Sequence, residues 1–518
     1  MDNRITIALT VIVVAIVAVA AFFVINGGSD DNNDDGTDIT PSTKSMTVEK
    51  YPDTYMCVLG NANLDLKIDS NDASEIQKFI DNKTSSSSSY KYEDYYMLDA
   101  NFDGIIDSND VDIVKAMVSA QRDGDWSKVI YVYYVNVDLN ISTYDMTRTD
   151  KVITLIAPPL DTVLAIGGKD LVVGTDDRIT TGKYHAEYET TLDFKNLIDV
   201  GSCNEPSTEE ITNAAMKYGG VDVVCGTKDS YGPTMESTFK GTSVQVIRIA
   251  SWEFGGTLYG MHTLGFLLKK VEGAQSYYDK YMEISKVVDA IVKETPSNKK
   301  AAGNIGAAAA YGYMDELSLL GEYTGEYANL MVLDPYDSAT PYLGGQSGGH
   351  GNTITTEGIS AMYQQYHLIN LILMIGTPFQ ITAQSGDAQS TANNIETLYN
   401  AWSNRIGSES MTNLNVCIAG YSFSSGVSEV LNRAILCYYM YNTEFLAHFG
   451  FTTQKQAQDK LAEYVDWYCS AIGIDDSWSF YGEDNGGKTG TRGMNLLYCG
   501  EDDERNIMYG LDKGFVTF

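Results

Sequence analysis

Basic residues are scarce in this chain of 518 residues, which has 35 Lys and Arg against 69 Asp and Glu. The formal net charge of −34 argues against a nucleic-acid partner, because proteins bind phosphate backbones through clusters of lysine and arginine. A hydrophobic content of 44% with 20% charged residues is typical of a folded globular protein. The length predicts about two to four domains.

Closely spaced cysteines are also absent. The seven cysteines form no CxxC or CxxxC pair, so we expect neither a zinc site nor a dense disulfide framework. One or two bridges outside the cell stay open as an alternative, and the odd number leaves at least one thiol unpaired or intermolecular. The cysteines are Cys57, Cys203, Cys225, Cys417, Cys437, Cys469 and Cys499.

Two common catalytic signatures are missing. The segment GYSFSSG, which begins at Gly420, does not fit the GxSxG pattern of a serine nucleophile, and no HExxH occurs. The sequence therefore favours a protein that is not an enzyme, although a pair of catalytic carboxylates would leave no such signature.

The chain begins with an apolar run from Ile5 to Ile25, interrupted only by two threonines. As a helix it would be roughly 30 Å long, enough to cross one bilayer core. Arg4 precedes the run and several aspartates follow it, which places the body of the protein outside the cell. We expect an anchor at 1–28 and a flexible linker at 29–53. A signal peptide cleaved after Ala20 is the alternative.

A pattern of oxygen-bearing side chains occurs twice, at Val58 onward and 38 residues later. A twelve-residue calcium loop needs donors at positions 1, 3, 5, 9 and 12, a carbonyl at 7 and preferably glycine at 6. The second copy meets each requirement, with Gly104 at position 6, whereas the first has Leu66 there. The predicted calcium ligands are Asp99, Asn101, Asp103, Ile105, Asp107 and Asp110 in the second loop, and Asn61, Asn63, Asp65, Lys67, Asp69 and Asp72 in the first.

Two such loops, each followed by one helix, resemble a dockerin module over residues 54–122. The resemblance implies calcium as a cofactor and a cohesin domain as a partner. Cohesin recognition would use loop positions 10 and 11, which are Ser70-Asn71 and Ser108-Asn109. The alternative is a spacer within the chain that calcium stiffens.

From Val129 onward, short Val- and Ile-rich runs alternate with helical patterns, as in VIYVYYVNV, KVITLIAPP, VDVVCGT and LNVCIAG. Such runs are typical of buried parallel strands, and their alternation with helices indicates an α/β fold. Residues 274–294 break the alternation with an amphipathic helix, whose apolar face includes Tyr277, Tyr281 and Ile284. This helix could join two lobes.

The order of these segments resembles the substrate-binding proteins of ABC importers for iron–siderophore, haem and cobalamin. The resemblance implies two Rossmann-like lobes joined by one long helix, with lobes at 129–273 and 295–518 and the helix at 274–294. The predicted fold class is therefore α/β, with a small all-α dockerin-like domain and an N-terminal transmembrane helix. Inserts at 311–349 and 376–412 and the tail after 470 depart from the family pattern.

The same resemblance implies that one acid on each lobe docks on arginines of the importer's membrane subunits. STEEI and TTEGI place these acids at Glu209, with Glu210 as the alternative, and at Glu357. An acid near a helix start also stabilises the helix dipole. Ligands of open α/β sheets bind outside the carboxyl ends of the strands. That rule selects Pro158, Asp176, Arg178, Lys228, Tyr231, Trp252, Tyr311, His350 and Tyr421. His185 in GKYHAEY is a further candidate for ligand binding.

The expected function is a membrane-anchored extracellular receptor that captures a metal chelate and delivers it to an ABC importer. Aromatic side chains would suit a flat chelate, and His185 or His350 could bind its metal. The alternatives are an enzyme displayed through a dockerin, such as a polysaccharide hydrolase, and a structural surface protein. A chromophore that purifies with the protein would distinguish a receptor from a hydrolase.

Overall fold

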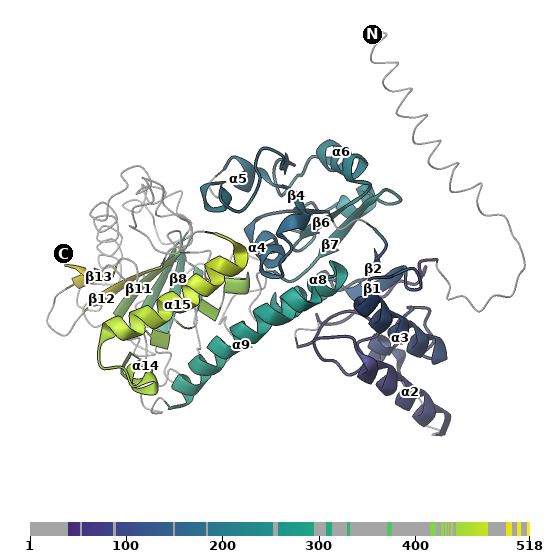
Figure 1. The fold of residues 1–518 in the computed structure, drawn as a ribbon, viewed down its shortest axis with the longest axis horizontal. Helices are drawn as coiled ribbons and strands as arrows, with labels where there is room; N and C mark the ends of the chain where they lie inside the picture. Colours follow the sequence, from purple (N-terminus) through teal and green to yellow (C-terminus); the bar gives the residue numbers. More distant parts are fainter. Residues whose placement is uncertain are drawn as a thin grey trace, which may run out of the picture. The chain divides into compact units, whose positions relative to one another are not determined.

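The computed structural model of the chain is shown in Figure 1. The residues that the structure describes are 40–51, 54–85, 90–148, 151–182, 185–251, 257–294 and 442–474, the short segments 307–312, 329–331, 370–375, 415–420, 426–428, 494–499, 505–508 and 515–517, and Val430, Leu431, Ala434, Cys437 and Tyr438. The apolar run at 5–25 lies outside these residues. Within them, no helix combines the length and the apolar character needed to span a bilayer.

A five-stranded parallel sheet forms the centre of the first α/β unit, with the strand order β5-β4-β3-β6-β7. Its central strands are mostly apolar and buried on both faces, and every residue of β3 and β6 is buried. The strands are β3 (Val152–Thr154), β4 (Val172–Thr175), β5 (Ile198–Asp199), β6 (Val221–Cys225) and β7 (Val244–Arg248). The helices that connect them are α4 (Ala157–Ala165), α5 (Asp177–Thr180), α6 (Thr208–Tyr218) and α7 (Met235–Thr238), with 3-10 turns η3 (Lys169–Leu171) and η4 (His185–Tyr188).

A second sheet has the strand order β14-β13-β12-β11-β10-β8-β9. Strands β8, β10 and β11 are parallel, whereas β9 and β12 to β14 pair antiparallel at the two sides. The tail after 470, which the expected family pattern left unexplained, thus supplies the antiparallel strands β12 to β14. The bounds are β8 (Ala307–Gly312), β9 (Asn329–Met331), β10 (Asn370–Ile375), β11 (Asn415–Gly420), β12 (Met494–Cys499), β13 (Arg505–Met508) and β14 (Phe515–Thr517).

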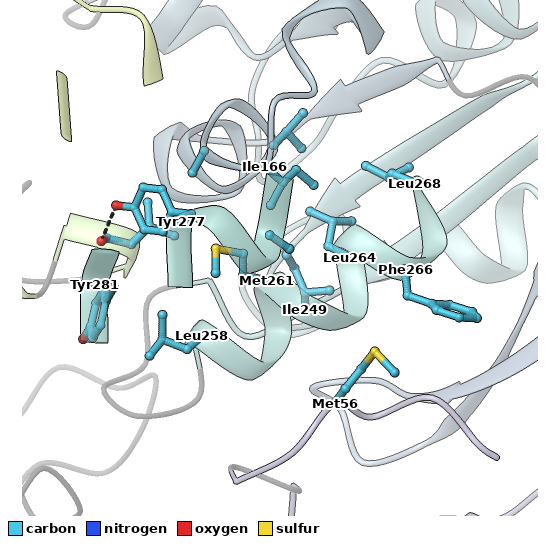
Figure 2. Packing of buried hydrophobic residues seen from close by; sticks show 14 of the residues in the cluster. Met56, Ile166, Ile249, Leu258, Met261, Leu264, Phe266, Leu268, Tyr277 and Tyr281 are labelled. Atoms are coloured by element: carbon cyan, nitrogen blue, oxygen red, sulfur yellow. Dashed lines mark hydrogen bonds between the residues drawn. The ribbon is translucent and has the colours of Figure 1, made fainter. Parts of the chain in front are cut away.

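The helix expected at 274–294 is present as α9 (Val271–Glu294), coloured teal in Figure 1. It buries Ala274, Tyr277, Tyr281 and Ile284 at helical spacing. Helix α8 (Thr257–Leu267) precedes it and is almost entirely buried. Figure 2 shows the apolar cluster around α8 and α9. The helices α14 (Asn442–Phe449) and α15 (Gln454–Ile472) and the turn η9 (Gly426–Ser428) complete the described elements of this part.

The loop–helix module, residues 54–123, contains α2 (Ser70–Ser85), the turns η1 (Tyr92–Asp94) and η2 (Tyr96–Leu98), and α3 (Ser108–Asp123). The module packs against the α/β part. In one buried contact, the Cys57 N–H donates to the Thr263 hydroxyl oxygen of α8 at 2.9 Å. The Trp126 ring also meets Phe266 edge-on at 5.7 Å between centroids. Such buried contacts indicate a fixed attachment.

The expectation of a parallel strand at VIYVYYVNV is wrong. Strand β1 (Tyr131–Val135) pairs antiparallel with β2 (Ile141–Asp145) in a separate two-stranded sheet. The N–H of Leu59 donates to the Tyr133 carbonyl, and the N–H of Val135 donates to the Cys57 carbonyl, so this hairpin extends the loop–helix module. An apolar strand can be buried by either kind of pairing, which is why its composition did not distinguish them.

Part of the expected linker at 29–53 packs on the loop–helix module. We call residues 42–48 the strap. The Ser42 N–H donates to the Tyr133 hydroxyl oxygen at 2.8 Å, and the Ser42 hydroxyl donates to the Phe102 carbonyl at 2.6 Å. Val48 is buried in a cluster with Leu59 and Phe102. A polar composition therefore did not prevent this segment from ordering on a neighbouring apolar surface.

Candidate calcium loops and ligand-binding edge

The second loop, residues 99–110, is closed by carboxylates that accept hydrogen bonds from its own backbone. Asp99 Oδ1 accepts from the Asp103 N–H at 3.1 Å, and Asp110 Oδ2 accepts from the Asp107 N–H at 2.9 Å. Asp107 in turn caps α3 in a capping box with Asp110. Gly104 has φ +98°, a conformation that favours glycine.

The first loop, residues 61–72, repeats this arrangement. Asp65 N–H donates to Asn61 Oδ1 at 3.2 Å, Lys67 N–H donates to Asp65 Oδ1 at 2.8 Å, and Asp69 N–H donates to Asp72 Oδ2 at 2.8 Å. The corresponding bonds of the second loop measure 3.1, 2.7 and 2.9 Å. The position-4 residues Leu64 and Phe102 share a positive φ, of 57° and 54°. The repeat in the sequence is therefore a repeat in backbone geometry.

The two loops differ at position 1. Asn61 uses its amide nitrogen to donate to the carbonyls of Met56 and Asp65, both at 2.8 Å. Asp99 has no such donor, and its Oδ2 instead accepts from the Tyr92 hydroxyl at 2.6 Å and from the Gly104 N–H at 2.8 Å. The second loop therefore has one more negative charge at its first position, and that carboxylate is fully buried.

Burial raises the pKa of the last carboxylate in both loops, to about 6 for Asp72 and to about 7 for Asp110. Burial also raises the pKa of Asp99. Buried carboxylates are costly when ionised without a compensating cation. Within the part of the chain that the structure describes, no group of three or more His, Cys, Asp or Glu side chains stands ready to hold a metal ion. The predicted loop donors, four of them aspartates in the second loop, are all oxygens, which is the type of donor that calcium prefers.

The carboxyl edge of the five-stranded sheet is the candidate ligand-binding edge. Asp176 follows β4, is fully buried, and accepts from the N–H groups of Ile156 at 2.6 Å and of Arg178 at 3.1 Å. Ile156 follows β3 with φ +66°. The Asp176 carboxylate therefore joins the ends of two neighbouring strands and leaves Arg178 exposed beside them.

Lys228 and Tyr231 follow β6 on the other side of β3. The Lys228 N–H donates to Asp138 Oδ1 at 2.9 Å, and its side chain is half-buried, whereas Tyr231 is buried. Because β4 and β6 flank β3, Arg178 and Lys228 start from strands about 10 Å apart. The edge therefore presents two cationic side chains.

Sequence reasoning missed Arg248, at the end of β7, which organises the loop that follows β6. Its guanidinium is buried and donates to Glu236 and to the carbonyls of Gly226, Tyr231 and Gly232. Asp138 Oδ2 lies 3.4 Å from its Nε. Nothing in VQVIRIA indicates these partners, because they come from other segments. A guanidinium with this many acceptors holds a loop in one conformation.

The second half of the chain reaches the same edge. A Cβ on Gly426 of η9 would lie 2.8 Å from the Ser251 carbonyl after β7 and 3.8 Å from Pro158 Cβ in α4. Gly426 follows the end of β11 by six residues. The turn η9 therefore lies at the carboxyl edge of the first sheet, beside the segments that follow β3 and β7.

Buried tyrosines join the two halves of the chain near this edge, and sequence reasoning missed these as well. Asp161 of α4 accepts from the Tyr188 hydroxyl at 2.7 Å and from the Tyr468 hydroxyl of α15 at 3.2 Å. The Tyr277 hydroxyl of α9 donates to the Val427 carbonyl at 2.7 Å. All three tyrosines are buried, so the contacts are shielded from water.

The other predicted site residues are placed as follows. His185 lies in η4 with its ring 4.1 Å from the Phe194 ring, and its buried Nδ1 has no hydrogen-bond partner among the described residues. Glu209 is exposed in the first turn of α6. Tyr311 lies in β8, of which only the backbone is described. Trp252, His350, Glu357 and Tyr421 lie outside the described residues.

A hollow of about 630 Å³ lies away from the candidate edge, between the first loop and α9. Its walls include Lys67, Glu272, Asp279, Lys280 and Glu283. A mostly charged lining is unlike the apolar walls of small-molecule cavities, so we do not assign the ligand to it.

No protein-family model matches the chain, and a search of curated proteins gives no match. Solved structures with a similar arrangement include the TroA-like periplasmic binding protein FepB of Veillonella parvula, with a TM-score of 0.43, 12% identity, and coverage of 64% of this chain and 95% of that one. The petrobactin-binding protein YclQ of Bacillus subtilis has a TM-score of 0.39, 13% identity, and coverage of 61% and 98%. A periplasmic haem-binding protein of Pseudomonas aeruginosa has a TM-score of 0.36, 12% identity, and coverage of 57% and 93%. At these scores the similarity assigns no role to any residue.

Proposed function

We propose that the α/β part is a non-catalytic receptor that binds a metal chelate of the iron–siderophore, haem or cobalamin type for an ABC importer. The observation that supports this proposal best is the contact of the turn η9, at Gly426, with Ser251 and Pro158, which follow β7 and β3 at the carboxyl edge of the first sheet. Ligands of open α/β sheets bind at such edges. Arg178 and Lys228 would attract the acidic groups of a chelate, and Tyr231 would contribute an aromatic wall.

The test is a titration of the purified chain with haemin, ferric siderophores and cobalamin, followed by the absorption bands of the ligand. We expect one class to bind and the double variant Arg178→Ala/Lys228→Ala to bind that class roughly tenfold more weakly, because two cations are lost. Lys217→Ala, which removes an exposed cation of α6 away from this edge, is the matched control and should bind normally. Absence of binding by all three classes would contradict the proposal.

We also propose that the loop–helix module binds calcium through both loops. What supports this proposal is that both loops repeat one backbone geometry, in which the carboxylates of Asp72 and Asp110 accept from the N–H groups at position 9. Dockerin-like recognition of a cohesin domain would use Ser70, Asn71, Ser108 and Asn109, and all four are exposed. Calcium titration of an Asp99→Ala variant should show the loss of one binding step, and a pull-down with cohesin domains tests the partner.

For delivery, we propose that Glu209 and Glu357 dock on the membrane subunits of the importer and that the segment 5–25 anchors the protein at the cell surface. The exposure of Glu209 supports the first part. Charged pairs at the rim of an interface steer association and fix register. The variant Glu209→Ala/Glu357→Ala should keep its ligand affinity and lose uptake. The protein should also fractionate with membranes, whereas a mature chain starting at Ala21 would show that the segment is a signal.

A further inference from the structure

Each proposed calcium loop has a lysine ammonium on one of its predicted ligand carboxylates. In the second loop, Lys44 Nζ lies 3.9 Å from Asp99 Oδ2, at loop position 1. In the first loop, Lys67 Nζ lies 2.7 Å from Asp69 Oδ2, at loop position 9. Both loops therefore already interact with a cation that belongs to the chain.

Lys44 reaches the second loop from outside, because it belongs to the strap. The Lys44 N–H donates to the Ser42 hydroxyl oxygen at 3.1 Å, and Ser42 is bonded to the Phe102 carbonyl within the loop. The ammonium lies 3.5 Å from the centre of the Tyr92 ring. It is also so near Gly104 that a Cβ there would lie 2.8 Å from Nζ. The strap thus holds the ammonium against the loop.

Two kinds of group act on Asp99. The Tyr92 hydroxyl and the Gly104 N–H are neutral donors that orient the carboxylate, as the partners of metal-ligating carboxylates do. The Lys44 ammonium also neutralises part of its charge and repels a second cation nearby. A neutral donor should therefore favour calcium binding, whereas the ammonium should oppose it.

We propose that Lys44 and Lys67 compete with calcium and raise the calcium concentration at which each loop fills. The inference rests on the proposed calcium binding and adds how that binding is adjusted. Since coupling between two sites is reciprocal, calcium in the second loop weakens the hold of the loop on Lys44 and on the strap. The effect is larger at Lys44, because Asp99 is fully buried while Lys67 and Asp69 are 54% and 27% exposed.

The experiment is calcium calorimetry on the purified full chain and on the variants Lys44→Met and Lys67→Met, which keep most of the apolar stem. We expect calcium affinity to rise roughly five- to tenfold in the second loop for Lys44→Met and about twofold in the first for Lys67→Met. Added salt should reduce the effect of Lys67→Met more than the effect of Lys44→Met, because the Lys67 pair is more exposed. Lys115→Met is the matched control, because Lys115 pairs at 3.1 Å with Asp112, which is not a loop ligand.

Two further variants separate charge from structure. Lys44→Arg keeps the positive charge and should keep the affinity of the unmodified chain. Tyr92→Phe removes a neutral donor and should lower the affinity roughly tenfold, opposite in sign to Lys44→Met. Calcium affinity that is unchanged or lower in Lys44→Met overturns the inference while leaving the calcium sites in place. An unmodified chain that gives no heat with calcium overturns the proposed sites and this inference together.

Discussion

The two loops of the loop–helix module show how nearly identical backbone geometry can carry different chemistry. Both are closed by an aspartate at position 12 that accepts from the N–H at position 9, at 2.8 Å in the first loop and 2.9 Å in the second. They differ at position 1, where Asn61 donates to two carbonyls and Asp99 accepts from Tyr92 and Gly104. At position 1 the first loop is therefore stabilised by neutral hydrogen bonds, whereas the second carries an additional buried charge that a cation would neutralise.

The largest expected effect comes from removing the charge at position 12. Asp110→Asn should abolish the stabilisation that saturating calcium gives through the second loop, about 3 kcal/mol at a hundredfold excess over Kd. Without calcium, at pH 7.5, the variant should be as stable as the unmodified chain or more so, because a buried ionised carboxylate is gone. Urea unfolding with and without calcium measures both. A loss of stability only in the absence of calcium would contradict this account.

The comparison also predicts how stability depends on pH. Burial raises the pKa of Asp110 to about 7 and that of Asp72 to about 6, against about 3.9 in the unfolded chain. Between pH 4 and 7 the folded chain then binds more protons, so its calcium-free stability should fall as the pH rises, by roughly 5–6 kcal/mol for the two carboxyls together. Calcium binds the ionised carboxylates. In saturating calcium the chain should therefore be more stable at pH 7.5 than at pH 5.5, the opposite of the calcium-free chain. Unfolding curves at both pH values, in chelator and in calcium, test the reversal.

Asn61→Asp should make the first loop more like the second. The added charge should raise calcium affinity of that loop roughly tenfold, while the loss of the donors to Met56 and Asp65 should cost about 1–2 kcal/mol without calcium. Calorimetry and urea unfolding measure the two effects separately. Affinity that does not rise would show that charge at position 1 does not cause the difference between the loops.

The smallest effects should come from position 6. Leu66→Gly should change calcium affinity less than threefold, because Leu66 is not among the residues with positive φ and its backbone needs no glycine. Gly104→Ala should cost about 1 kcal/mol or more, since it strains a residue at φ +98° and brings a Cβ to 2.8 Å from Lys44 Nζ. Equal effects of the two substitutions on thermal unfolding would contradict the proposed difference in backbone conformation at position 6 of the two loops.

The sequence allowed the loops and the parallel strands to be predicted because both depend on local patterns. Alternating oxygen donors within twelve residues determine a loop, and short apolar runs such as VDVVC determine a buried strand. The antiparallel pairing of β1 was missed, since Tyr131–Val135 is apolar in either kind of sheet. The strap was missed because its apolar contacts lie on other segments.

The organisation of the ligand-binding edge could be predicted only in part. The strand-end rule located Arg178 and Lys228, which lie at the same edge. Arg248 and the Asp161–Tyr468 contact were missed because their partners are distant in sequence, as far as 307 residues for Asp161 and Tyr468. No local spacing indicates such a pair. Buried polar contacts of this kind become visible only when the fold brings the segments together.

The most direct test of the account is a calorimetric titration of the unmodified chain with calcium at pH 7.5. Two binding steps of different affinity are expected, the tighter one belonging to the second loop, and Asp99→Ala should remove that step alone. The tighter step should also release protons, because Asp110 has a pKa of about 7 without the metal. A titration with no heat, or one in which Asp99→Ala leaves both steps unchanged, would contradict the central claim that the two loops bind calcium unequally.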